Sequence, residues 1–432
     1  MAGEHVPVVL RTVAKAKPWL ANWAGFPLPQ GDISPQPTDI VPLPLSKTAS
    51  RVKARKPSGG PLLSELAAQF LQERGAGESA VSGQHLHQSA ATYRLTMELL
   101  GDVPPADLTR RHAAELRGLL LRLPASHGKA RNGKTAIKAI EEADGQQATG
   151  QQVERLKEKT CKRHFSALQQ LWKWLADREL VTLNPFEGWT FKNGKASQAR
   201  DDWSELDLLR LLETPWLGHD EPWDSHRRWF PMIAMWSGMR LEEIARLRPV
   251  DVQLLQGTPT ILIQDQPAMG DLPPWTPKTE AGARAVPVHP ELQRLGFLDL
   301  MEHRRAAKAS RLFPELRPTG PDRKLGVEFS RRFSKLKIDA GIGERTTFHS
   351  FRHSVSTILR NTTLREEWID AVLGHESGSR SQGAQVYLKR IGIENLTATV
   401  QAVKYPGRVM ECLGRRSHQF RDAGRLLLAR EG

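Results

Sequence analysis

Six side chains in the second half of the sequence have the types and the order that metal-free phosphate chemistry requires: Arg240, Lys278, His349, Arg352, His375 and Tyr387. An arginine fork binds two oxygens of one phosphate, and a second arginine completes the cage, with histidines as further donors. A tyrosine whose phenolate is stabilised by cations can attack phosphorus, and a positioned lysine can protonate the departing oxygen. Together, these residues predict cleavage of a phosphodiester through a covalent phosphotyrosine.

Taken singly, each of these residues has an ordinary structural interpretation. An arginine after a glycine break, such as Arg240, is typical of a surface charge, and a hairpin lysine such as Lys278 is usually exposed. His349 and Arg352 lie three residues apart, a spacing common on any helix, and His375 after Leu-Gly is typical of a helix end. The occurrence of all of them in order within one module favours the chemical interpretation.

The bulk composition narrows the class of protein. A chain of 432 residues is long enough for two or three domains, and 39% hydrophobic with 25% charged residues is typical of a globular protein. A formal charge of +14 favours a polyanionic partner such as nucleic acid. Cys161 and Cys412 are too far apart to indicate a metal or disulfide framework. The sequence has no apolar leader or membrane-length run, so we expect a cytoplasmic protein without membrane association. It has no Gly-rich phosphate loop, Walker sequence, His-Glu-x-x-His motif or paired carboxylates, so we expect no metal or cofactor.

Composition changes along the chain predict its domains. Residues 1–60 are proline-rich and end in a basic cluster, which predicts an extended or poorly ordered arm. Residues 61–187 have helical periodicity and predict a helical domain, and a polar linker follows at 188–202. Residues 203–395 carry the six candidate residues. The tail at 396–432 has a partial apolar stripe, suited either to contact with a neighbouring protomer or to folding back on its own domain.

Periodicity gives the expected elements of each module. The stretch "LLSELAAQFLQER" places apolar residues at three-to-four spacing and predicts an amphipathic helix. Residues 125–150 lack a strong stripe and are predicted to be a loop or insertion. In the second module "TPTILIQD" and "ARAVPVHP" predict a small antiparallel sheet, and helical patterns follow to the end. The expected fold class is mainly α with a small antiparallel β-sheet.

A long helix is predicted within residues 153–187, with several cations on it. These cations include Lys159, Lys162 and Arg163. By themselves they are typical of a solvated helix face.

The motifs of the second module resemble those of the tyrosine recombinase (phage integrase) family. The resemblance is carried by "SGMRLEEIARL", "PKTEAGARAVPV", "FHSFRHSVST", "LGHES" and Tyr387, from about residue 200 to 390. The helical stretch ending "SALQQLWKWLADRELVTLNPF" is similar to the core-binding domain of that family. The resemblance implies a helical, SAM-like core-binding domain followed by a mixed α/β catalytic domain.

The same resemblance implies a role for each candidate residue. Arg240 and Arg352 would clamp the scissile phosphate, and His349 would hydrogen-bond it and act as a base. Lys278 would be the general acid for the 5′ oxygen, and His375 would donate to a non-bridging oxygen.

Tyr387 would form the 3′-phosphotyrosyl bond, with Tyr405 as the alternative nucleophile. Glu243 and His353 match positions that support the site without doing chemistry. On this reading Lys159, Lys162 and Arg163 become candidate DNA contacts.

The implied activity is site-specific recombination of duplex DNA without metal or ATP. Exchange would require a tetramer of protomers on two DNA sites, alone or with sister recombinases or accessory DNA-bending proteins. Two alternatives stay open. A type IB topoisomerase uses nearly the same chemistry to relax supercoils, and a catalytically inactive protein of the same fold would only bind DNA.

Overall fold

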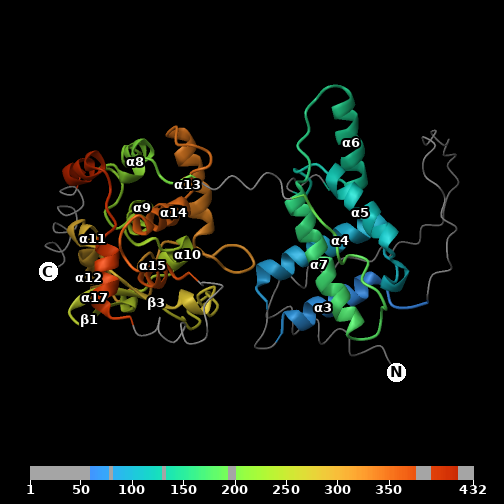
Figure 1. Ribbon diagram of the computed structural model, residues 1–432, viewed down its shortest axis with the longest axis horizontal. Helices are drawn as coiled ribbons and strands as arrows, with labels where there is room; N and C mark the ends of the chain where they lie inside the picture. Colours follow the sequence, from blue (N-terminus) through green and yellow to red (C-terminus); the bar gives the residue numbers. More distant parts are fainter. Residues whose placement is uncertain (1–58, 77–80, 129–132, 193–200, 376–390, 417–432) are drawn as a thin grey trace. The chain divides into compact units, whose positions relative to one another are not determined.

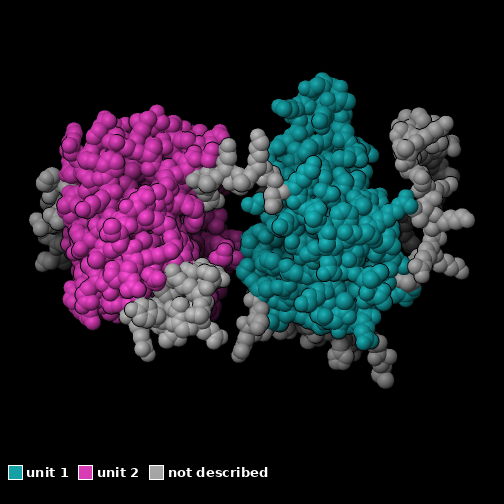
Figure 2. All heavy atoms as spheres, in the orientation of Figure 1, with its two compact units in different colours: residues 1–197 teal, residues 198–432 magenta. Residues whose placement is uncertain are grey.

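The computed structural model describes residues 59–76, 81–128, 133–192, 201–375 and 391–416. The chain divides into two compact units, residues 1–197 and 198–432, each with its own hydrophobic core (Figure 2). Nearly all of the expected N-terminal arm, most of the linker, Tyr387 and the last part of the tail lie outside the described residues.

The first unit is entirely helical in its described part (Figure 1). Its α-helices are α3 (Leu63–Arg74), α4 (Gly83–Leu100), α5 (Arg110–Arg122), α6 (Ala136–Ala148) and α7 (Glu158–Ala176), with a 3₁₀ turn η1 (Pro105–Asp107) before α5. The predicted long helix corresponds to α7. Its apolar stripe is buried in the core of the unit, namely Phe165, Leu168, Leu171, Trp172 and Leu175.

The sequence predicted a loop or insertion at 125–150, and the loop was wrong for half of this stretch, which is helix α6. The Thr135 side chain caps the helix by accepting a hydrogen bond from the Lys138 backbone N–H. Ala136, Ile140 and Ala143 form its buried face. Two of these three residues are alanines, so the stripe is too weakly hydrophobic to stand out in the sequence.

The second unit combines helices with one sheet. Its helices are α8 (Glu205–Leu212), α9 (His226–Ser237), α10 (Leu241–Ala245), α11 (Pro290–Arg294), α12 (Phe297–Ala306), α13 (Val327–Asp339), α14 (Ser350–Arg360), α15 (Glu366–Leu373) and α17 (Ile393–Gln401). Helix α9 is buried on nearly all sides and packs against α10, α11 and α14, so it forms the centre of the unit.

The sheet has three antiparallel strands in the order β1 (Val252–Leu255), β2 (Thr258–Ile263) and β3 (Arg284–Pro287). Ile261 on β2 pairs with Val252 on one side and Val286 on the other. This confirms the predicted fold class, with β1 as a strand that the two predicted runs did not include. Helix α17 packs on β3 and on α15 (Figure 1).

None of the helices in the described part of the chain combines the length and apolar composition needed to cross a lipid bilayer.

Candidate active site

The site begins where α9 ends at Gly238. This residue has a left-handed backbone (φ 63°), and a Cβ there would lie 2.7 Å from Leu373 Cδ2, so only glycine fits the turn. The turn places Arg240 immediately before α10. Arg240 Nη1 donates to Glu243 Oε1 (2.7 Å), and Nη2 donates to the Gly374 carbonyl oxygen (3.0 Å). Arg240 is therefore held by two elements far apart in the sequence.

Arg352 is a buried guanidinium with an unfilled donor. It lies in the first turn of α14 and is 4% exposed. Its Nη1 donates to the Gly238 carbonyl oxygen (3.0 Å), but its Nη2 has no hydrogen-bond partner among the described residues. Burial, followed by the charges of Arg240 and Arg284, lowers the pKa of the Arg352 guanidinium to about 9. A buried cation with an unused donor is costly in free energy, so this position is suited to an anionic ligand.

Glu243 is the carboxylate that fixes two of the arginines. Its Oε1 accepts from Arg240 Nη1 (2.7 Å) and Arg284 Nη1 (3.1 Å), and its Oε2 accepts from Arg284 Nη2 (2.8 Å). Burial raises the pKa of the Glu243 carboxyl, but the charges and hydrogen bonds of Arg284 and Arg240 outweigh that effect and hold the pKa below its usual value. Glu243 thus stays ionised and holds the side chains of Arg240 and Arg284 in place.

Arg284 is a residue of this site that sequence reasoning missed. Its side chain is 4% exposed. Besides Glu243, it donates from Nε to the Val372 carbonyl (2.7 Å) and from Nη1 to the Gly282 carbonyl (2.9 Å), so it joins α10, β3 and the end of α15. The available signal was the alternation in "ARAVPV". Arg284 shares a strand face with the buried Val286, and an arginine on an inward face predicts a buried ion pair.

His375 follows α15 at a second left-handed glycine. Gly374 has φ 65°, and a Cβ there would lie 2.8 Å from the Ala281 carbonyl oxygen, so this turn also requires glycine. His375 is half-buried, and its Nδ1 lies 3.4 Å from Asp370 Oδ1. Because Arg240 binds the Gly374 carbonyl, the structure brings the His375 turn beside the arginines.

The two histidines of "HSFRHS" lie together at the start of α14. The rings of His349 and His353 meet edge to face with centroids 5.0 Å apart. The His349 carbonyl accepts from the backbone N–H of Arg352 (3.1 Å). His349 is half-buried and His353 is exposed. His349 therefore lies one turn from the unfilled donor of Arg352, whereas His353 is turned toward solvent.

Lys278 lies in the irregular excursion between β2 and β3. It is exposed, and no hydrogen bond or ion pair joins it to another of the described residues. The excursion ends in the 3₁₀ turn η4 (Glu280–Gly282), which contacts Gly374 through Ala281. With about 3.8 Å between consecutive Cα atoms, the backbone of Lys278 lies within about 11 Å of Ala281. The lysine is thus near the arginines but not held in their network.

The two candidate tyrosines differ. Tyr387 lies outside the described residues. Tyr405 is buried, donates its hydroxyl to the Met235 carbonyl oxygen (2.8 Å) and packs edge-on against Trp236. Burial raises the pKa of the Tyr405 phenol. A phenol in this setting neither ionises readily nor reaches a substrate, so its geometry does not suit a nucleophile.

In the first unit, the predicted DNA-contact residues share one helix. Lys159, Lys162 and Arg163 are exposed on α7, and none forms an ion pair with another residue of the described ranges. Their charges are therefore available to a polyanion.

The arrangement suits an anion without a metal. Arg240 and Arg284 both bind the carboxylate of Glu243. The guanidinium of Arg352 lies near enough to feel the charges of Arg240, Arg284, Glu243 and Asp370. Across the described ranges, no cluster of three or more His, Cys, Asp or Glu side chains is arranged to hold a metal ion.

Inorganic phosphate is expected to stabilise the folded chain by filling the donor of Arg352. An anion that binds only the folded state stabilises it by RT ln(1 + [L]/Kd). At concentrations well above Kd, phosphate should therefore increase the free energy of unfolding by about 1–3 kcal/mol and the melting temperature by a few degrees. The measurement is thermal unfolding in phosphate and in chloride of equal ionic strength. The same comparison on Arg352→Met should show no difference between the salts, and an equal response of both proteins would contradict this assignment.

Comparison with known families agrees with this geometry. Residues 205–389 match the phage integrase family. This part of the chain is similar to that family. The matched stretch begins with α8 and ends after α15. It therefore includes Arg240, Lys278, Arg352, His375 and Tyr387. No curated protein sequence matches the chain.

Solved structures show the same fold. The Tn1549 transposon integrase in complex with transposon right end DNA has 17% sequence identity and a TM-score of 0.50, covering 77% of this chain and 99% of that one. The same integrase in complex with a circular intermediate DNA has 15% identity and a TM-score of 0.50, covering 82% and 99%. At these identities the likeness concerns the fold alone.

Proposed function

We propose that this protein is a site-specific DNA recombinase that cleaves and rejoins duplex DNA through a 3′-phosphotyrosyl intermediate, independently of metal and ATP. The observation that carries the proposal is the buried, unfilled Nη2 of Arg352 beside Arg240. A DNA phosphate offers two non-bridging oxygens to this pair, and the extra negative charge of a pentacoordinate phosphorus strengthens the interaction in the transition state.

Each residue then has one role. Arg240 and Arg352 clamp the scissile phosphate, while His349 hydrogen-bonds it and acts as a base. His375 donates to a non-bridging oxygen. Lys278 protonates the 5′ oxygen as it leaves, because its exposed side chain is free to turn toward bound DNA.

The nucleophile is Tyr387, and elimination supports this. The sequence has three tyrosines. Tyr93 is buried, donates its hydroxyl to the Ala167 carbonyl (3.0 Å), and has its pKa raised by burial. Tyr405 is constrained in the same way. Because both phenols are buried and hydrogen-bonded to backbone, Tyr387 is the one suited to attack phosphorus.

We further propose how the chain engages DNA. Residues 61–187 form the core-binding domain, in which Lys159, Lys162 and Arg163 contact the backbone, and residues 203–395 form the catalytic domain. Four protomers act on two DNA sites, alone or with sister recombinases or DNA-bending proteins, and the tail at 396–432 contacts a neighbouring protomer. The substrate is the DNA of a mobile element, handled in the cytoplasm.

Tyr387→Phe is expected to abolish covalent DNA attachment, because the phenyl ring has no oxygen to attack phosphorus. The DNA site is first selected from a random-sequence duplex library by binding to the full chain. A nicked version of the selected duplex then traps the covalent protein, which is measured as an SDS-stable adduct. The matched control is Tyr405→Phe, which should still form the adduct, although the loss of its buried hydrogen bond costs about 1 kcal/mol of stability.

The same assays separate the alternatives. Exchange between two selected sites supports recombination, whereas relaxation of plasmid lacking such sites would support a topoisomerase. A wild-type protein that binds its selected duplex but never forms an adduct would indicate a DNA-binding protein without catalysis.

A further inference from the structure

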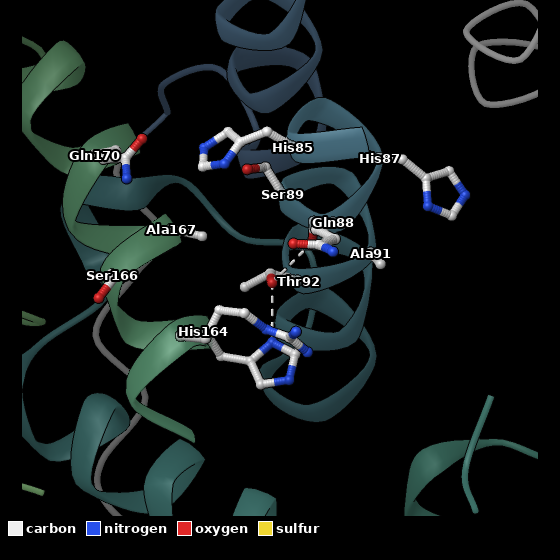
Figure 3. Close-up of a pocket in the computed structure, with 11 residues that line it drawn as sticks. His85, His87, Gln88, Ser89, Ala91, Thr92, His164, Ser166, Ala167 and Gln170 are labelled. Atoms are coloured by element: carbon white, nitrogen blue, oxygen red, sulfur yellow. Dashed lines mark hydrogen bonds between the residues drawn. The ribbon is translucent and has the colours of Figure 1, made fainter. Parts of the chain in front are cut away.

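The first unit carries a pocket of about 230 Å³ between α4 and α7 that the proposed roles do not use (Figure 3). Its lining includes Thr92 from α4 and Arg163, His164 and Ala167 from α7. None of the described residues that line it is acidic. The pocket therefore combines polar groups, one cation and an alanine methyl, without a carboxylate that would repel a nucleic acid.

The hydrogen bonds in the pocket fix the state of His164. The Thr92 hydroxyl donates to the Gln88 carbonyl oxygen (3.1 Å), and Thr92 Oγ1 lies 2.9 Å from His164 Nδ1 (Figure 3). A hydroxyl has only one hydrogen, so both contacts are hydrogen bonds at once when His164 Nδ1–H donates to Thr92 Oγ1. In a neutral imidazole this leaves Nε2 as an acceptor.

The ring is neutral at physiological pH. Burial, followed by the charge of Arg163, lowers the pKa of His164 to about 4. The neutral ring of His164 therefore has one hydrogen-bond acceptor, Nε2. The neighbouring guanidinium of Arg163 has only donors.

The pocket continues a row of cations along α7. Lys159, Arg163, Ser166 and Gln170 follow one another at spacings of three or four, so they share one helix face. Gln170 Oε1 accepts from Arg74, which leaves the Gln170 amide hydrogens as donors. Cations that suit phosphates thus adjoin a small pocket whose surface is mainly apolar, with His164 and Thr92 among its polar groups.

We propose that this pocket reads an A·T base pair in the major groove of the DNA site. His164 Nε2 accepts from the N6 amino group of adenine, and Ala167, three residues along α7, contacts the C5-methyl group of the paired thymine. Guanine would set its O6 acceptor against the His164 acceptor, and a G·C pair has no methyl group for Ala167. The inference rests on the proposed function, because it assumes that the first unit binds duplex DNA.

The test is selection from a random-sequence duplex library with the full chain and its variants. For the wild type, one position of the selected site should favour A·T over G·C by about 10-fold or more. His164→Phe, which removes the acceptor, should reduce the preference at that position toward one and leave the others unchanged. His87→Phe is the matched control, because His87 lies on the rim of the pocket and points away from the other lining residues (Figure 3).

A second pair of variants keeps the test decisive if His164→Phe unfolds. Thr92→Val removes the hydroxyl that orients the ring and should weaken the A·T preference, whereas Thr92→Ser keeps the hydroxyl and the preference. If the wild type selects a site and the variants of His164 and Thr92 select the same site with the same preference, the inference is overturned and the proposed function stands. If the wild type selects no sequence at all, the proposed site-specific function fails with it.

Discussion

Replacing Arg352 with methionine is expected to lower the rate of DNA cleavage by about 10²–10³ and to leave thermal stability equal or higher. The rate falls because one pre-aimed donor to the phosphate is lost. Stability does not fall with it, because the folded chain no longer buries a guanidinium whose Nη2 has no partner in the described ranges. The hydrogen bond from Nη1 to the Gly238 carbonyl is lost as well, which offsets part of the gain.

The measurement combines single-turnover cleavage of the selected duplex with thermal unfolding without DNA. Arg294→Met is the matched control, because Arg294 forms a partly exposed pair with Glu291 and should alter neither quantity by more than about 1 kcal/mol. If Arg352→Met melted well below the wild type and lost activity only in proportion to unfolding, Arg352 would be a structural residue.

Arg284→Met is expected to reduce the free energy of unfolding of the second unit by about 3 kcal/mol or more. The substitution leaves the buried Glu243 carboxylate with Arg240 as its one remaining ion-pair partner, and removes the bonds to the Val372 and Gly282 carbonyls. Breaking a buried pair from one side is costly because the remaining charge is poorly solvated. Urea unfolding followed by tryptophan fluorescence measures the change.

A double variant distinguishes the cost of breaking the Arg284–Glu243 ion pair from the cost of losing the Arg284 side chain. Arg284→Met with Glu243→Met removes both charges and should be more stable than Arg284→Met alone. Arg331→Met is the control, because the Arg331–Glu328 pair is exposed to solvent and its loss should leave the stability almost unchanged. A loss below 1 kcal/mol for Arg284→Met would show that Arg284 does not hold the site together.

Strong local patterns allowed much of the fold to be predicted. The stripe of α7 contains large apolar residues such as Leu168 and Trp172, so its period is clear. The strands β2 and β3 contain β-branched residues flanked by turn signals. Helix α6 was missed because its buried face is mostly alanine, which carries little hydrophobic signal.

The candidate site was predicted as a set of residue types, but its connections were not predictable. Arg240 binds the carbonyl of Gly374 at a separation of 134 residues, and no local pattern encodes such a contact. The alternation around Arg284 indicates an inward face, but no local pattern identifies Glu243 or the Val372 carbonyl as its partners. Left-handed turns at Gly238 and Gly374 bring these groups together, and their packing against Leu373 and Ala281 depends on the complete fold.

In the proposed mechanism, Arg240 and Arg352 hold one DNA phosphate for attack by the phenol of Tyr387. The most direct test is to trim the DNA from the trapped adduct with nuclease and find the modified peptide by mass spectrometry. A nucleotide remnant on Tyr387 is the predicted result. A remnant on Tyr93, on Tyr405 or on any residue other than a tyrosine would contradict the claim.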